Sequence, residues 1–307
     1  MTRTRDRSAV ARGVLLGTFV GDALGARWEG SPATDLDGGR DRLDRSLSAA
    51  TLTYTDDTQL TLALAEHLCD HVEVDPARLT TTFAEHFEPH RGYARGMFGL
   101  VEAWQAGLPV EQAARAVFPD GSFGNGAAMR VAPVGVVLVD APVDIIDAAH
   151  RQAAVTHAHP IGMDAAGAQA HAVGLAARTG AFGLAELRDV IDVCRTDELR
   201  RAMTVAAELA AAGASLPEVE QRLGTGVLAD QSVPTALWVA AVAEDLPTAV
   251  TTALALGGDV DTIAAMACAV LGAACTDAAI PPTWLGKLED GVRGRSYAVA
   301  LAARLVA

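Results

Sequence analysis

One segment, TIAAMACAVLGAA at Thr262–Ala274, constrains the fold most, because it carries no charge over 13 residues and consists mainly of small apolar side chains. A helix that is apolar all round is buried on every side, so this segment is predicted at the centre of the molecule. Apolar residues recur at helical spacing in residues 57–72, 145–155, 161–177 and 198–212. The best extended stretch, Thr51–Tyr54, is too short to nucleate a sheet, and the charged segment Asp35–Ser48 is predicted as a surface loop. The chain is therefore expected to be all-α, with residues 1–307 forming a single compact domain of many helices.

Charge and cysteine content limit the possible partners. The 38 Asp and Glu outnumber the 24 Lys and Arg, which gives a net charge of −14 and disfavours an extended nucleic-acid interface. The four cysteines form no C-x-x-C pair, which is typical of a reducing compartment. The apolar stretch Gly13–Gly21 is short and is soon followed by Asp22. We interpret it as the first helix of the fold and expect a cytoplasmic protein without a membrane partner.

Two acidic clusters each open a predicted helix. The first is Tyr54-Thr55-Asp56-Asp57-Thr58, and the second is Gly257-Gly258-Asp259-Val260-Asp261-Thr262. Each supplies two carboxylates and adjacent hydroxyls, the oxygen ligands that Mg²⁺ and Mn²⁺ prefer. For either cluster alone, ordinary helix capping is the better interpretation, because Asp and Thr are common at helix starts.

The presence of both clusters favours a cation site. Capping needs one side chain at each helix end, whereas each cluster supplies more than that. The glycines Gly257 and Gly258 allow a close backbone approach that capping does not require. Facing acidic helix ends would also repel each other without a cation between them. The sequence therefore predicts a central cleft that holds two ions, Mg²⁺ or Mn²⁺.

Three other polar features are compatible with a binding site. Asp22 is either a hydrogen-bonded buried acid or a support for the site, and Glu29 taken alone reads best as a surface residue. The glycine-rich stretch from Gly121 to Arg130 suits a phosphate, and Phe123 within it could stack on a base or ribose, although an ordinary helix entry fits equally well. His157, in Thr-His-Ala-His, is either a ligand contact or part of a surface turn.

Taken together, these segments resemble the ADP-ribosylglycohydrolase family. The landmarks G-D-A-L-G with Glu29, Y-T-D-D-T, G-N-G-A-A-M-R, T-H-A-H and G-G-D-V-D-T appear in the family order between Gly13 and about Gly272. The resemblance implies an all-α fold with two Mg²⁺ or Mn²⁺ ions in a central cleft. Arg27 and Gly30 differ from the residues common at these positions, so the shape of the entrance and the linkage cleaved stay open.

The resemblance also implies roles for individual residues. Glu29 matches the acidic residue near the scissile bond and, with Asp57, is the candidate catalytic group. The candidate metal ligands are Thr55, Asp56, Asp57, Asp259, Asp261 and Thr262. The candidate substrate-binding residues are Ser122, Phe123, Gly124, Asn125, Gly126, Ala127, Met129 and His157.

The implied reaction is hydrolysis of the glycosidic bond between ADP-ribose and an acceptor. The expected substrate is an ADP-ribosylated protein, modified for example on arginine or serine, or another ADP-ribosyl conjugate, and the product is ADP-ribose. Such a reaction passes through an oxocarbenium-like transition state. Two alternatives stay open: a binding or structural relative without activity, and a metal-dependent pyrophosphohydrolase of ADP-ribose.

Overall fold

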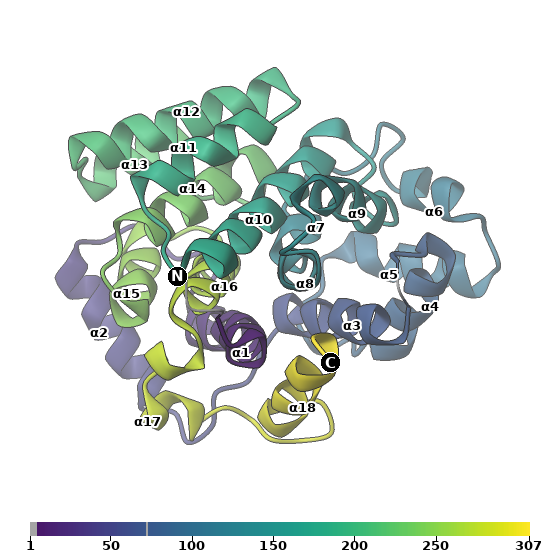
Figure 1. The fold of residues 1–307 in the computed structure, drawn as a ribbon, viewed down its shortest axis with the longest axis horizontal. Coiled ribbons are helices and arrows are strands. Elements are labelled where there is room, and N and C mark those ends of the chain that lie inside the picture. The colour runs from purple at the N-terminus through teal and green to yellow at the C-terminus, as the bar shows by residue number, and fades with distance from the viewer. Residues whose placement is uncertain (1–4, 72) are drawn as a thin grey trace.

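The computed structural model describes residues 5–71 and 73–307, and within them it contains α-helices and short 3₁₀ turns but no β-sheet (Figure 1). The expectation of a single compact all-α domain is confirmed. The α-helices are α1 (Arg7–Gly25), α2 (Leu36–Leu47), α3 (Asp56–Asp70), α4 (Pro76–His86), α5 (Arg95–Gln105), α6 (Val110–Ala116), α7 (Gly126–Met129), α8 (Ala132–Val137), α9 (Pro142–Ala154), α10 (Pro160–Thr179), α11 (Leu184–Val193), α12 (Asp197–Ala212), α13 (Leu216–Leu223), α14 (Ala229–Val242), α15 (Leu246–Leu256), α16 (Val260–Cys275), α17 (Pro282–Leu285) and α18 (Arg295–Leu305).

Helix α16 lies at the centre of the molecule, between α1 and α10 in Figure 1. Every residue from Val260 to Ala274 is buried, and the helix also packs against α14 and α15. This confirms the prediction made from its small apolar side chains. The residues that open this helix are therefore held in the interior, by packing on all sides.

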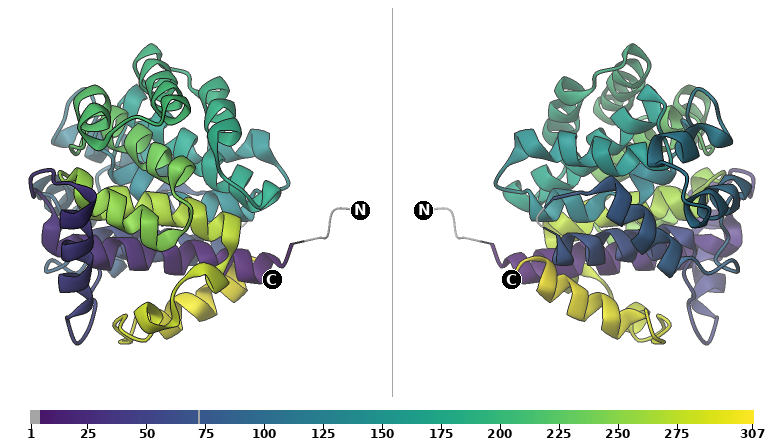
Figure 2. Two further views of the ribbon diagram at one scale, coloured as in Figure 1. Left: turned by 90° about the vertical axis from the view of Figure 1, so that its left-hand side faces the viewer. Right: turned by 90° about the vertical axis from the view of Figure 1, so that its right-hand side faces the viewer.

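The first helix, α1, packs against α16 in the most extensive helix–helix contact of the described residues. Figure 2 shows α1 in purple beside the yellow-green α16. The segment Arg7–Trp28 is long and apolar enough to cross a membrane by length and composition, but 83% of its most apolar window is buried inside the protein. Such burial is that of a core helix, as the sequence predicts for Gly13–Gly21.

Two expectations about local structure meet different outcomes. Thr51–Tyr54 forms no strand, and Leu52 makes only an isolated bridge to Leu288. The prediction of a loop at Asp35–Ser48 is wrong, because α2 occupies it. Asp35 caps this helix by accepting a hydrogen bond from the Gly38 amide, and the absence of a side chain on Gly39 lets α2 press against the backbone of α15. The predicted helix at residues 57–72 is α3; its last position, Val72, lies outside the described residues.

Candidate active site

The start of α3 is fixed by a buried carboxylate of α1. Asp22 is fully buried and accepts hydrogen bonds from the backbone amides of Thr55 and Thr58 at 3.0–3.1 Å, and from both hydroxyls. Thr55 in turn caps α3, since its hydroxyl accepts from the Asp57 amide. Burial raises the pKa of Asp22 to about 6, against the opposing effect of these hydrogen bonds. Asp22 is thus a hydrogen-bonded buried acid that positions the first acidic cluster.

The start of α16 is held by backbone contacts on both sides. Gly258 exchanges hydrogen bonds with the segment after Glu29: its amide donates to Ser31, and its carbonyl accepts from Gly30. Gly257 and Gly258 have positive φ angles of 72° and 75°, and a Cβ on either would collide with Ser31–Ala33 or with Thr225. The close approach expected from these glycines is therefore to the chain itself, and it brings Glu29 next to Asp259.

Both acidic clusters open onto one pocket of about 320 Å³, a size suited to a small-molecule ligand. Glu29, which follows the 3₁₀ turn after α1, also lines this pocket. The lining residues from the two clusters are Thr55, Asp56, Asp57, Asp259, Asp261 and Thr262. Helix capping does not account for the four aspartates. The Thr55 side chain caps α3, and Asp259 makes no capping hydrogen bond at α16.

The pocket gathers several carboxylates, and Arg130, which also lines it, forms no ion pair with any of them. No Lys, Arg or His in residues 5–71 and 73–307 forms an ion pair with these carboxylates. Burial, together with the neighbouring acids, raises the pKa values of Asp57 and Asp261 well above the ordinary range and that of Asp56 to about 7. Partial burial and then Asp259 raise the pKa of Glu29.

These residues fit a hard divalent cation. Asp57 is 3% exposed, and its Oδ1 atom is buried without a hydrogen-bond partner in the part of the chain that the structure describes. An unpartnered carboxylate oxygen among other buried carboxylates is stabilised by a cation that accepts oxygen ligands. Among the described residues, no three His, Cys, Asp or Glu side chains are grouped closely enough to hold a metal ion in this structure.

The glycine-rich loop and His157 form another wall of the same pocket. The lining residues from this wall that the sequence predicts are Ser122, Gly124, Asn125, Gly126, Met129 and His157. Asn125 joins the two walls, because its amide group donates to Asp259 and, at 3.0 Å, to Ser232. Two predicted substrate-binding residues do not line the pocket. Ala127 is fully buried in the core, and Phe123 is 39% exposed and packs against the ring of His159.

Sequence reasoning missed the apolar part of the pocket. This wall comes from the segment before α5, from α5 itself and from the end of α6, and it includes Tyr93, Met97, Leu100, Val117 and Phe118. Phe118 is 49% exposed, so its ring is accessible to a ligand in the pocket. The only available signal was an aromatic residue directly before the turn at Pro119-Asp120-Gly121.

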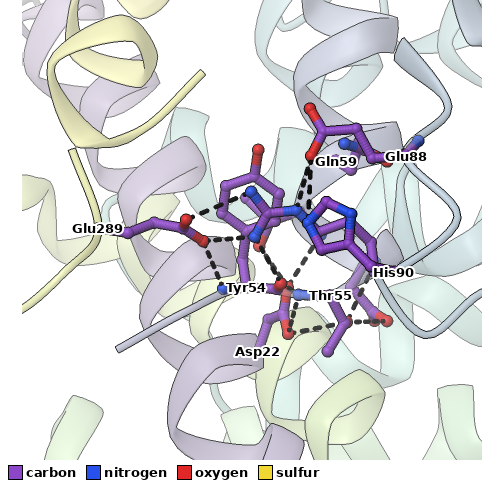
Figure 3. A network of polar contacts seen from close by, with 10 residues as sticks. Asp22, Tyr54, Thr55, Gln59, Glu88, His90 and Glu289 are labelled. Carbon is purple, nitrogen blue, oxygen red and sulfur yellow. Dashed lines mark hydrogen bonds and ion pairs between the residues drawn. The ribbon is translucent and has the colours of Figure 1, made fainter. Parts of the chain in front are cut away.

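A second feature that the sequence did not predict is an ion pair, Arg91–Glu289, that holds the Tyr54–Asp56 segment in place. The Arg91 guanidinium pairs with both carboxylate oxygens of Glu289, lies 3.7 Å from the centre of the Tyr54 ring and donates to the Tyr54 carbonyl. Glu289 accepts from the Tyr54 amide at 2.9 Å, and the Asp56 amide donates to the Arg91 carbonyl at 2.7 Å. Figure 3 shows Glu289 and Asp22 beside Tyr54 and Thr55 of this segment. Asp56 is thereby positioned by residues far away in the sequence.

We expect Glu289→Gln to lower activity by about 10- to 100-fold, because residues that orient metal-binding side chains have effects of that size. It should also lower the free energy of unfolding by about 1–3 kcal/mol, since Arg91 loses one of its two charged partners in a largely buried place and keeps only Glu88. Activity assays of the folded variant and thermal unfolding measure the two effects.

The matched control is Asp70→Asn, which breaks the exposed ion pair between Asp70 at the end of α3 and Arg304 in α18. An exposed pair contributes about 0–1 kcal/mol, so neither stability nor activity should change much. If Glu289→Gln loses activity only in proportion to its unfolded fraction, Glu289 supports the fold and does not position the site.

Comparison with known proteins agrees with this architecture. The sequence profile of the ADP-ribosylglycohydrolase family matches residues 2–307. The chain therefore belongs to the ADP-ribosylglycohydrolase family, a family of ADP-ribosyl hydrolases.

Individual relatives cover nearly the whole chain. The ADP-ribosylhydrolase ARH3 of Gallus gallus is 30% identical over 92% of this chain and 90% of its own length. ARH3 of Xenopus tropicalis is 31% identical over 89% of each. A solved structure titled ADP-ribosylglycohydrolase-related protein complex superposes with a TM-score of 0.73 at 27% identity, over 97% of both chains.

Proposed function

We propose that this protein hydrolyses the glycosidic bond between ADP-ribose and a modified protein side chain, and that it needs two divalent cations, Mg²⁺ or Mn²⁺, to do so. The observation that carries the proposal is the single pocket in which the acidic clusters face the glycine-rich loop. Such a pocket offers oxygen ligands on one wall and backbone amides with His157 on the other. The family membership and the ARH3 relatives support the same reaction.

In this proposal, one set of pocket residues binds the cations and Glu29 exchanges a proton. The cations, held by Thr55, Asp56, Asp57, Asp259, Asp261 and Thr262, would supply positive charge for orienting ribose hydroxyls and water. Water adds to the anomeric carbon of the ribose, and the acceptor atom leaves with a proton. Glu29 stands at the pocket edge with a raised pKa, which suits a group that exchanges a proton at this position.

The glycine-rich wall binds the nucleotide half. The loop from Ser122 to Gly126 presents backbone groups and Asn125 to the diphosphate and ribose, while the exposed ring of Phe118 offers apolar surface for a base. The acceptor side chain would enter past Glu29. The acidic entrance favours a cationic acceptor such as arginine over an acidic one.

Removing the cations is expected to abolish turnover. Release of ADP-ribose from arginine- and serine-linked substrates should fall by about 10²-fold or more in a chelator, because water and sugar lose their orienting charge. Adding back Mg²⁺ or Mn²⁺ should restore it. Each bound cation should raise the free energy of unfolding by about 2.7 kcal/mol at a concentration of 100 Kd.

Product analysis separates the alternatives. AMP with ribose phosphate would identify a pyrophosphohydrolase, and tight ADP-ribose binding without turnover of either linkage would identify a binding protein. Equal rates with and without chelator would contradict the cation dependence and leave the glycosidic reaction standing.

A further inference from the structure

The imidazole of His157 lies directly beneath the glycine-rich loop. A Cβ atom on Gly126 would stand 2.7 Å from Cε1 and 3.0 Å from Nε2 of this ring, and one on Gly124 would stand 3.5 Å from Nε2. Nε2 has no hydrogen-bond partner within the described residues, whereas the ring lines the pocket. This nitrogen is therefore the one available to a ligand.

The other ring nitrogen contacts a hydroxyl whose own bonding is constrained. His157 Nδ1 lies 2.7 Å from Oγ1 of Thr156, and Arg130 Nη2 donates to the same oxygen at 2.8 Å. A guanidinium can only donate, so Arg130 occupies a lone pair of the Thr156 hydroxyl. This hydroxyl makes no hydrogen bond to any other acceptor in the described residues, so its single proton points to Nδ1.

Gln152 fixes the donor and acceptor roles in this series of hydrogen bonds, because it holds Arg130. Its Nε2 atom donates to the Ala127 carbonyl at 2.9 Å, which settles which end of the amide is the oxygen. That oxygen accepts from Arg130 Nε at 2.8 Å, and the Gln152 carbonyl accepts from Arg130 Nη2 at 2.9 Å. Arg130 is 1% exposed and lies over the Phe83 ring, so it cannot swing away from these partners.

We propose that Gln152, Arg130 and Thr156 are positioning residues that hold His157 in the tautomer protonated at Nε2, so that this nitrogen donates a hydrogen bond to a ligand oxygen. The ring then acts as a neutral donor beside the glycine loop. Burial, with the charge of Arg130 adding to it, lowers the pKa of His157 to about 3, which keeps the ring uncharged at neutral pH. The part of this inference that concerns the ligand rests on the proposed function.

The tautomer is measured directly by ¹⁵N NMR of the imidazole nitrogens in the full chain at neutral pH. We expect one neutral species with the proton on Nε2 and a hydrogen-bonded Nδ1. A proton on Nδ1 in the wild-type protein would overturn the proposal, and this result needs no variant and no ligand.

The variant Thr156→Val removes the hydroxyl while keeping the shape of the side chain. The Nδ1 resonance should move, and the Nδ1-protonated form should become detectable; Thr156→Ser should restore the wild-type spectrum. Thr18→Val is the matched control, because Thr18 is also buried and, within the described residues, its hydroxyl bonds only to the Val14 carbonyl. An unchanged Nδ1 resonance in Thr156→Val would count against the proposal.

Titration with ADP-ribose tests the ligand part. The Kd should rise about 10-fold in Thr156→Val, recover in Thr156→Ser and stay unchanged in Thr18→Val. If the wild-type tautomer is as expected but ADP-ribose does not bind, the proposed function fails and the tautomer assignment stands. If ADP-ribose binds equally well to Thr156→Val and to the wild type, the positioning role fails and the proposed function stands.

Discussion

Replacing Asp57 by asparagine is expected to reduce turnover by about 10³-fold and yet to stabilise the cation-free protein. Asp57 has a buried, unpartnered oxygen and faces Asp22, Asp56 and Asp261, all of them acidic. Asparagine has nearly the same shape but no charge, so the repulsion disappears together with the cation ligand. In a chelator, the free energy of unfolding should rise by about 1–2 kcal/mol, and the gain on adding Mg²⁺ should shrink. Activity assays and denaturant unfolding with and without Mg²⁺ measure these changes.

A structural aspartate of similar burial provides the control. Asp164 is 2% exposed and accepts hydrogen bonds from the amides of Arg195 and Thr196 and from the Thr196 hydroxyl. Asp164→Asn should therefore lower the free energy of unfolding by about 1–3 kcal/mol and leave the turnover of the folded protein unchanged. If Asp57→Asn behaves like Asp164→Asn in both measurements, Asp57 is a structural residue and the assignment of the acidic pocket is wrong.

The contrast between these aspartates shows what a sequence pattern can predict. Asp56, Asp57, Asp259 and Asp261 occur in short motifs with more carboxylates than a helix end uses, so their joint opening onto one pocket could be anticipated. Arg91 and Glu289 have no such motif. They are 198 residues apart in the chain, and their meeting depends on how the segment after α17 packs against Tyr54. The apolar wall around Phe118 could not be predicted either, because its residues form no recognisable sequence motif.

The fold was predictable to a similar degree. Small apolar side chains on all faces mark α16 as central, because no other position satisfies such a helix. For α2 the local composition was misleading. Its charged residues and the pair Gly38-Gly39 look like a loop, but the helix forms because Gly39 allows tight packing against α15. Tertiary packing overrides propensity at that position, and a single sequence carries no record of it.

Gly21→Ala is expected to cause a large loss of stability. Four glycines at four-residue spacing face α16, and a Cβ on each would lie 2.5 Å or less from its backbone: Gly13, Gly17, Gly21 and Gly25. At Gly21 the new Cβ would be 2.4 Å from the carbonyl oxygen of Ala264 and 2.5 Å from its carbonyl carbon. Backbone atoms in the core cannot turn aside as a flexible side chain can, so the two helices must separate.

The expected cost is about 3 kcal/mol or more in the free energy of unfolding, measured by denaturant titration. Gly99→Ala is the control, because Gly99 lies in α5, where the added Cβ would meet only the exposed side chain of Val117 at 3.3 Å. There alanine should be neutral or stabilise by up to about 1 kcal/mol, since it favours helix. Separation of α1 from α16 would also move Asp22, which holds the start of α3. Mg²⁺ should therefore stabilise Gly21→Ala less than it stabilises the wild type, and equal stabilisation of both would show that the acidic pocket does not depend on the close packing of these two helices.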